Sequence, residues 1–237
     1  MILLFPWSLT YASNLLVDLA ASACASASVP LTLHLDHAQD ETIIKRAADM
    51  PFDSIMVDMS HHSKAENLAR TTALVEHCHA RGIATEAEPG RIEGGEDGLA
   101  DTADLEGLLT TAEEAREFVD TGIDWLAPAF GNVHGSYGPR GIRLEYERLE
   151  AIRRAVGGKV RLVLHGTDGF DEGVFARCIE GGITKVNVNK VVNRSYVDLL
   201  KEKAGKVGVT QLMEEGTDVM QKVVERLMDQ LGSSGKA

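Results

Sequence analysis

Apolar segments with the pattern of buried strands alternate with helical segments along almost the whole chain. Strand patterns separated by helices of about 10–15 residues predict a parallel sheet with right-handed crossovers. Seven strands are predicted, at 2–5, 31–36, 54–59, 83–88, 125–130, 160–165 and 185–188. Eight helices are predicted, at 14–26, 41–50, 64–81, 111–121, 145–156, 171–180, 191–204 and 210–231.

Residues able to bind a metal or move a proton stand at or near the C-terminal ends of strand segments all along the chain. In a (β/α)8 barrel these ends converge on one catalytic face, whereas an open sheet concentrates its chemistry at one switch point. We therefore predict an α/β chain with a (β/α)8 barrel and C-terminal helices. The side chains concerned are Asp36, His37, Glu86, Glu88, His134 and His165.

Three of these strand-end residues are histidines, namely His37, His134 and His165. A buried strand-end histidine is often only a hydrogen-bonded core residue. Three on one rim are instead typical of a catalytic zinc site with an open position. Glu86 and Glu88 share one face of their strand, where carboxylates are costly to bury unless they bind a metal or share a proton. The alternative is a solvated acidic loop.

The bulk properties restrict the class of protein. The chain has 237 residues and a formal net charge of -12, which argues against nucleic-acid binding because no basic surplus exists to neutralise phosphates. An anionic small substrate would need a local cationic cluster or a metal. We predict one domain over residues 1–231, followed by a frayed tail at 232–237.

The location is predicted from the cysteines and the apolar runs. Cys24, Cys78 and Cys178 are odd in number and form no CxxC pattern, which is typical of reduced, buried thiols in a cytoplasmic protein. No Lys or Arg precedes Lys45, which argues against a signal peptide. No apolar run approaches the ~20 residues that span a bilayer.

Six short motifs, in this order along essentially the whole chain, resemble the class II, zinc-dependent fructose-bisphosphate aldolases and the related ketose-bisphosphate aldolases. Each motif alone is weak, but their order is specific. They are Leu33-His-Leu-Asp-His37, Asp58-Met-Ser-His61, Glu86-Ala-Glu88 with Gly95-Glu-Asp97, His134-Gly-Ser-Tyr137, Leu164-His-Gly166 and Lys185-Val-Asn-Val188.

The resemblance implies a metal site and two catalytic carboxylates. His37, His134 and His165 would be the zinc ligands, and Glu88 would match a carboxylate that binds metal at or near the same place. The zinc ion, or another divalent metal, would act on the ketone oxygen as a Lewis acid. The two catalytic carboxylates would be Asp36, the acid that protonates the aldehyde oxygen, and Glu96, the base that exchanges the substrate's carbon proton.

The resemblance also implies a substrate, a phosphorylated ketose like fructose 1,6-bisphosphate. Asn187 would contact it, and Gly135 and Gly166 would shape the phosphate site. Asp168 stands where the family has a phosphate-binding serine, and a carboxylate repels phosphate. Lys190, which also departs from the family pattern, could neutralise Asp168 or bind phosphate itself. The chain therefore resembles a divergent branch.

The chain resembles the family only from the family's second strand onward, so we expect an incomplete barrel without the first βα unit, with unpaired edges at strands 2–5 and 185–188. The short N-terminus and Asp168 leave open a metal-binding pseudoenzyme or structural subunit. A metal-dependent sugar isomerase or epimerase on the same fold is the other alternative. A Schiff-base aldolase is disfavoured because Lys185 only begins a strand.

Self-association is the last expectation from sequence. The resemblance implies a homodimer or higher homo-oligomer. The helix at 210–231 carries an apolar face, which packing on the barrel or a dimer interface would explain.

Overall fold

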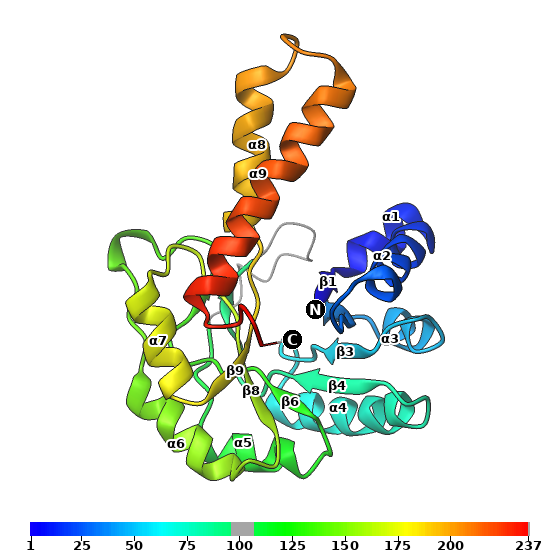
Figure 1. Ribbon diagram of the computed structural model, residues 1–237. Helices are drawn as coiled ribbons and strands as arrows, with labels where there is room; N and C mark the ends of the chain where they lie inside the picture. The colour runs from blue at the N-terminus through cyan, green and yellow to red at the C-terminus, as the bar shows by residue number, and fades with distance from the viewer. Residues whose placement is uncertain (96–106, 237) are drawn as a thin grey trace.

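The computed structural model of the protein describes residues 1–95 and 107–236. Within these residues, seven parallel strands form one sheet that curls into a half-barrel, as predicted (Figure 1). The sheet order is β1-β2-β3-β4-β6-β8-β9, so β1 and β9 are its outer strands. The strands are β1 (Ile2–Leu4), β2 (Leu33–Ala38), β3 (Ser54–Val57), β4 (Ala84–Ala87), β6 (Trp125–Leu126), β8 (Arg161–Leu164) and β9 (Ile183–Val186).

Helices connect the strands and cover the outside of the sheet (Figure 1). Several are capped by the residue that precedes them: Asp40 caps α3, and Ser63 and Thr111 form capping boxes with Glu66 and Glu114 on α4 and α5. The helices of the described chain are α1 (Pro6–Ala12), α2 (Leu15–Ser26), α3 (Glu41–Ala47), α4 (Lys64–His79), α5 (Ala112–Val119), α6 (Tyr146–Val156), α7 (Glu172–Glu180), α8 (Lys190–Lys203), α9 (Val209–Gln230) and the 3₁₀ turn η1 (Gly138–Arg140).

Several elements differ from the sequence prediction. Helix α1 was not predicted, although Pro6 opens it at the position that proline favours. A second, two-stranded sheet pairs β5 (Glu93–Gly94) with β7 (Val133–His134), which are too short to show a period in sequence. Strand β6 ends at Leu126 rather than at residue 130, because the backbone then turns toward the small sheet.

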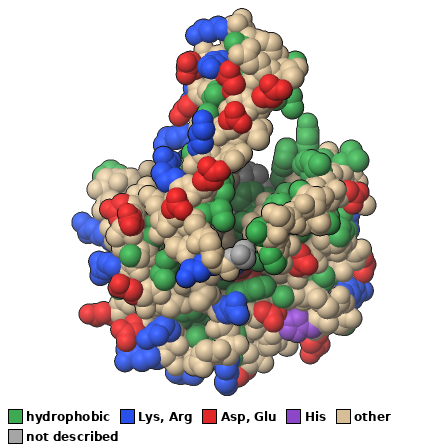
Figure 2. Space-filling view, in the orientation of Figure 1, with side chains coloured by type: hydrophobic (Ala, Val, Ile, Leu, Met, Phe, Trp, Pro, Cys, Tyr) green, Lys and Arg blue, Asp and Glu red, His purple; other side chains and the backbone are tan. Residues whose placement is uncertain are grey.

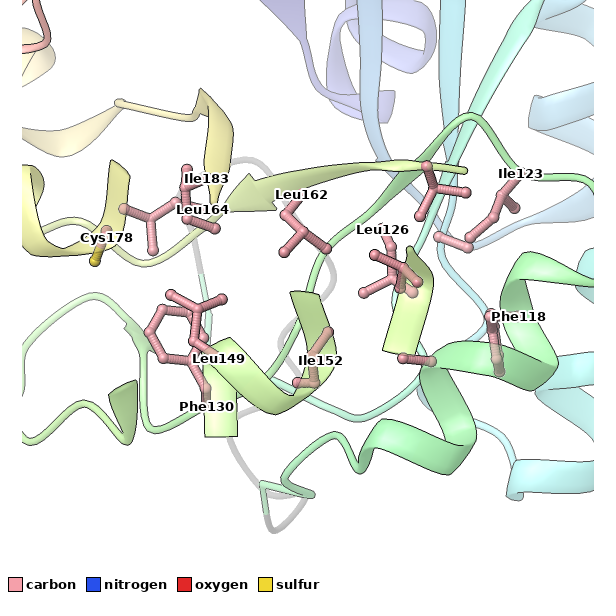
Figure 3. Packing of buried hydrophobic residues seen from close by; sticks show 14 of the residues in the cluster. Phe118, Ile123, Leu126, Phe130, Leu149, Ile152, Leu162, Leu164, Cys178 and Ile183 are labelled. Carbon is pink, nitrogen blue, oxygen red and sulfur yellow. The ribbon is translucent and has the colours of Figure 1, made fainter. Parts of the chain in front are cut away.

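The core lies between the sheet and its helices. Figure 3 shows one part of it, where Leu126, Leu162 and Leu164 of the strands meet Phe118 of α5 and Ile152 of α6. All of these side chains are at least 98% buried. A second apolar cluster fills the space between β1–β3 and helices α1–α4. Both clusters lie outside the curl of the sheet, while the inner face carries polar side chains together with a small apolar cluster of Met56, Ala127 and Val163.

Helices α8 and α9 pack against each other as a hairpin that projects from the half-barrel (Figures 1 and 2). Only the C-terminal half of α9 reaches the core, where Val223 and Leu227 are buried. The apolar face predicted at 210–231 therefore packs on the barrel in that half and on α8 in the other. None of the helices described combines the length and apolar character needed to cross a membrane.

None of the three cysteines forms a disulfide bond, as predicted. Cys78 and Cys178 are buried, and burial raises the pKa of the Cys78 thiol to about 11. Cys24 is only half-buried on α2, so the prediction of burial holds for two of the three.

Candidate metal centre at the strand ends

His37 lies inside β2, not just beyond a strand as the sequence prediction placed it. Its backbone φ is +47°, a left-handed conformation that residues other than glycine rarely adopt. The strand pairing with β3 shifts register between Leu35 and Ala38, and this irregularity turns the imidazole over the rim of the half-barrel. The ring is buried, with 4% of the residue exposed.

A buried carboxylate orients the His37 ring. Nδ1 of His37 lies 2.9 Å from Oδ2 of Asp58, and Asp58 accepts two further hydrogen bonds from the backbone and side chain of Ser60. Because an ionised carboxylate only accepts, Nδ1 carries the hydrogen and Nε2 points into the site. Burial alone would raise the pKa of Asp58, but the hydrogen bond and charge of His37 hold it well below its usual value.

His165 is held in the same way at the end of β8. Its Nε2 lies 2.7 Å from Oε1 of Glu86, whose other oxygen lies 2.7 Å from Nζ of Lys185. Burial opposes ionisation of Glu86, but the Lys185 charge and the His165 hydrogen bond lower its pKa to about 2. Nδ1 of His165 therefore faces the site, 2.9 Å from Nε2 of His37.

His134 comes from β7 and completes the group. Its ring lies almost parallel to that of His165, with 5.7 Å between the ring centroids. Two side chains tie its loop to the His165 strand: the amide of Asn132 donates to the carbonyl of His165, and the hydroxyl of Tyr137 donates to the carbonyl of Gly166. Neither Asn132 nor Tyr137 was predicted to matter, because their partners lie about 30 residues away in sequence.

The three histidines form a group that fits a metal ion. Each offers a ring nitrogen, and these atoms lie within 4.8 Å of one another. Nε2 of His134 is buried and has no hydrogen-bond partner among the described residues. An unsatisfied buried polar atom costs about 1–3 kcal/mol. A metal would satisfy this nitrogen, so the donors present match the imidazole sites that zinc and related ions prefer.

Glu88 belongs to a second, overlapping group. It lies with His37 and Asp58, whose candidate ligand atoms are also within 4.8 Å of one another. One oxygen of Glu88 accepts from the backbone N–H of Ile92, and the other is buried without a partner in the part of the chain described. Burial, reinforced by the Asp58 charge, raises the pKa of Glu88 to about 8. Its spare oxygen is thus a further candidate ligand atom beside His37.

Asp36 and Asn187 lie together beside the histidines. The amide nitrogen of Asn187 donates to both oxygens of Asp36, at 3.2 and 3.0 Å. Burial opposes ionisation of Asp36, but the charge of His37 and a hydrogen bond from His34 hold its pKa well below the usual value. Both residues line a cavity of about 400 Å³ that also contains the three histidines. Figure 2 shows the hollow that lies between the α8–α9 hairpin and α1–α2.

The remaining predicted residues lie at the edge of this site. Lys190 opens α8, and its Nζ is 3.5 Å from Oδ2 of Asp168, so the two unusual residues do pair. A Cβ on Gly135 would come within 3.9 Å of that nitrogen. A Cβ on Gly166 would come within 2.5 Å of the carbonyl of Val133, which explains the glycine as a backbone contact. Glu96 lies outside the described residues.

The predicted position of Lys185 requires correction, and two charged residues near the histidines were given no role. Lys185 lies inside β9, not at its beginning, so the reason given against a Schiff-base lysine was wrong. The ion pair with Glu86 replaces that reason, because a charged ammonium lacks the lone pair that attacks a carbonyl. Asp58 and Lys185 were present in the sequence motifs but received no role, and only the fold brings them to the histidines.

Comparisons with known proteins point to one family. A family model described as "Fructose-bisphosphate aldolase class-II" matches residues 1–236. A Coccidioides immitis (strain RS) protein, provisionally named a fructose-bisphosphate aldolase, is 64% identical over 245 residues, covering 100% of this chain and 81% of that protein. The fructose-bisphosphate aldolase of Geobacillus stearothermophilus is 37% identical over 216 residues, covering 89% of this chain and 73% of that protein.

Solved structures show the same fold. A crystal structure of the Coccidioides immitis protein has a TM-score of 0.98 at 66% identity and covers 100% of this chain and 83% of that one. The structure of the YdjI aldolase from Escherichia coli K12 has a TM-score of 0.84 at 29% identity, with the same two coverages of 100% and 83%.

Proposed function

Because the chain belongs to the class II fructose-bisphosphate aldolase family, a family of carbon–carbon lyases, we propose that it catalyses the metal-dependent cleavage and condensation of a phosphorylated ketose. The products of cleavage would be dihydroxyacetone phosphate and an aldehyde. The observation that carries the proposal is the convergence of three buried histidines, one of which has a ring nitrogen without a partner among the described residues.

The proposed ligands of the metal are His37, His134 and His165, with Glu88 as a fourth. Zinc is the proposed ion, since three imidazoles and an open position suit it. When bound, the metal would supply Lewis-acid polarisation of the substrate's ketone oxygen. Asp58 and Glu86 hold two of the imidazoles with the correct nitrogen facing inward, which supports a preformed site.

Asp36 is proposed to move the proton of the aldehyde oxygen. Its low pKa means that it begins ionised. In the cleavage direction it would accept the proton of the hydroxyl that becomes the aldehyde, and in the condensation direction it would return that proton. Asn187 orients both carboxylate oxygens, and its own Oδ1 is buried without a partner in the described chain, so it can accept from a substrate hydroxyl. Glu96 remains the predicted base at carbon.

Lys190 is proposed to hold the substrate's phosphate together with the backbone at Gly135 and Gly166. It stands at the N-terminus of α8, where the helix dipole also favours an anion. Asp168 takes part of the Lys190 charge, so we expect weaker phosphate binding than a serine at that position would permit. Fructose 1,6-bisphosphate is the proposed test substrate, not the only one.

A homo-oligomer and a cytoplasmic location remain predictions. The exposed apolar side chains of α1 and α2 support self-association, because a monomer would leave them in water. They are Trp7, Tyr11, Leu15 and Leu19, which are 49, 74, 75 and 68% exposed.

The test is triose phosphate release from fructose 1,6-bisphosphate by the zinc-loaded protein, with and without a chelator. We expect release that stops on chelation and returns when zinc is restored. His165→Ala should lose both metal binding and cleavage. Interconversion of sugars without triose would instead identify an isomerase or epimerase. Zinc retention without turnover of any ketose phosphate would identify a pseudoenzyme.

A further inference from the structure

We propose that Lys185 is a positioning residue that acts through Glu86 to hold His165 in its metal-binding orientation. The inference rests on the proposed metal site and deepens it. It concerns two residues that have no role in the proposal above beyond the support Glu86 gives to one imidazole.

The three side chains form one line of contacts across the interior of the half-barrel. Nζ of Lys185 on β9 is 2.7 Å from Oε2 of Glu86 on β4, and Oε1 of Glu86 is 2.7 Å from Nε2 of His165 after β8. Strands β4 and β9 are not neighbours, since β6 and β8 lie between them. The line of contacts therefore connects two strands, β4 and β9, that are separated by two others in the sheet.

Burial makes this line energetically necessary. Glu86 is completely buried and lies near the buried carboxylate of Asp36, with Nε2 of His34 3.7 Å from each. A buried carboxylate is costly unless a cation or hydrogen-bond donors compensate its charge. The side chain of Lys185 is 11% exposed, and its ammonium supplies the compensating charge at hydrogen-bond distance. With the anion secured, Nε2 of His165 must be the protonated nitrogen, which leaves Nδ1 for a metal.

Lys185 compensates the charge of Glu86 from outside the cavity. The cavity wall, as far as the chain is described, includes His165 but neither Glu86 nor Lys185. Lys185 therefore does not line the pocket that would hold the substrate, and its influence passes through the carboxylate.

The experiment measures metal affinity and the visible spectrum of the Co²⁺-loaded full chain, without any assay of turnover. Lys185→Met removes the charge at similar length, and Lys185→Arg keeps a cation. We expect Lys185→Met to lower Co²⁺ affinity about 10–100-fold in competition with a chelator, the range typical of lost outer partners of metal ligands. Its d–d bands should shift, and Lys185→Arg should recover part of both losses.

A double-mutant cycle tests the route through Glu86. Glu86→Gln keeps an oxygen that can accept from His165 but removes the negative charge. Once this charge is gone, Lys185→Met should cost no more than a further factor of about two, because nothing remains for the ammonium to neutralise. Additive losses would mean that Lys185 acts directly, which would overturn the inference. The double variant removes both buried charges together, so it leaves no unpaired buried charge to destabilise the fold.

The matched control is Lys203→Met, which breaks an ion pair of similar length, 2.6 Å to Glu215, on the projecting hairpin. Its metal affinity and spectrum should equal those of the unmodified protein. Unchanged affinity and bands in Lys185→Met would overturn the positioning role and leave the proposed function standing. Failure of the unmodified protein to bind Co²⁺ would overturn the metal site itself.

Discussion

His134 can be tested by substitution, because a ligand role and a structural role predict different effects on the stability of the metal-free protein. Its Nε2 is buried without a partner in the described chain. If it serves only as a ligand, His134→Phe should abolish metal binding at the site yet leave the metal-free protein as stable as before, or more stable, since an unsatisfied polar atom costs about 1–3 kcal/mol. Urea unfolding of the metal-free proteins measures this.

The control for that prediction is Asn132→Leu in the same loop. Both ends of the Asn132 amide are used, one donating to the carbonyl of His165 and the other accepting from the N–H of Phe130. This variant should lose about 1–3 kcal/mol of unfolding free energy. An equal loss in His134→Phe would show that the His134 ring is needed by the fold itself.

The sequence pointed to the three histidines that the fold brings together, but it assigned no role to the side chains that orient them. His37, His134 and His165 stand at or next to strand ends, where a period of two and a following glycine or helix can be recognised. Local patterns placed Glu86 at a strand end but could not pair it with His165 or Lys185. Glu86 is 79 residues from His165, and Lys185 is 99 residues from Glu86. Only the curl of the sheet, which sequence periodicity does not specify, brings them together.

Among the helices, α3 depends on a cap that titrates. The carboxylate of Asp40 accepts from the backbone N–H groups of Ile43 and Thr42, which lower its pKa below the usual value. Its contribution to stability is therefore present above about pH 4 and is lost as pH falls through the folded-state pKa. Asp40→Ala should cost about 0.5–2 kcal/mol near neutral pH.

The measurement is the difference in urea midpoint between the unmodified protein and Asp40→Ala as a function of pH. We expect a constant difference from pH 7 to about pH 4 and a narrowing below it. Asp40→Asn should retain most of the cap but show no such narrowing relative to Asp40→Ala. A difference that stays constant into acid would contradict a charged cap.

The α8–α9 hairpin depends on a glycine where helix propensity alone would prefer alanine. A Cβ on Gly216 would overlap the ring of Tyr196 on α8. Alanine would gain about 1 kcal/mol in propensity but force overpacking that costs about 1–3 kcal/mol, so Gly216→Ala should be neutral at best and more often destabilising by 1 kcal/mol or more. Gly173→Ala on α7, whose Cβ would meet only the N-cap carboxylate of Asp171 at 3.3 Å, should destabilise less than Gly216→Ala. Thermal unfolding compares the two.

At the level of elements, the apolar pattern predicted the order and type of all seven main strands but not their ends. The strand prediction at 125–130 was the longest overshoot, because apolar residues continue into a buried turn after Leu126. Helix α1 was missed because seven residues give too little period to recognise. The order of the strands was thus easier to predict than where each strand stops.

For the molecule as a whole, a metal that binds only the folded state must raise its stability. At a concentration 100 times Kd the gain is about 2.7 kcal/mol. For a chain of this size that corresponds to roughly 5–10 °C in Tm. Calorimetry with zinc and with a chelator should show this difference, and His134→Phe should abolish it. A zinc-dependent rise of equal size in His134→Phe would place the ion elsewhere.

The same calorimetric experiment tests the predicted single domain over residues 1–231. One transition, with equal calorimetric and van't Hoff enthalpies, is the expected result. Two separable transitions would show that the α8–α9 hairpin, which meets the core mainly through the end of α9, unfolds by itself.

The close backbone packing around β7 also determines which positions can tolerate substitution during evolution. Gly94 and Gly166 stand directly against the carbonyls of His134 and Val133, so any side chain there would push the histidine strand out of place. Asp168 and Lys190 have room in front of them and are 24 and 47% exposed. A substitution of Asp168 or Lys190 can therefore change the charge at the mouth of the pocket without disturbing the backbone, whereas a side chain at Gly94 or Gly166 would displace it. Proteins that share this fold are therefore expected to change their substrate preference before they change the reaction that they catalyse.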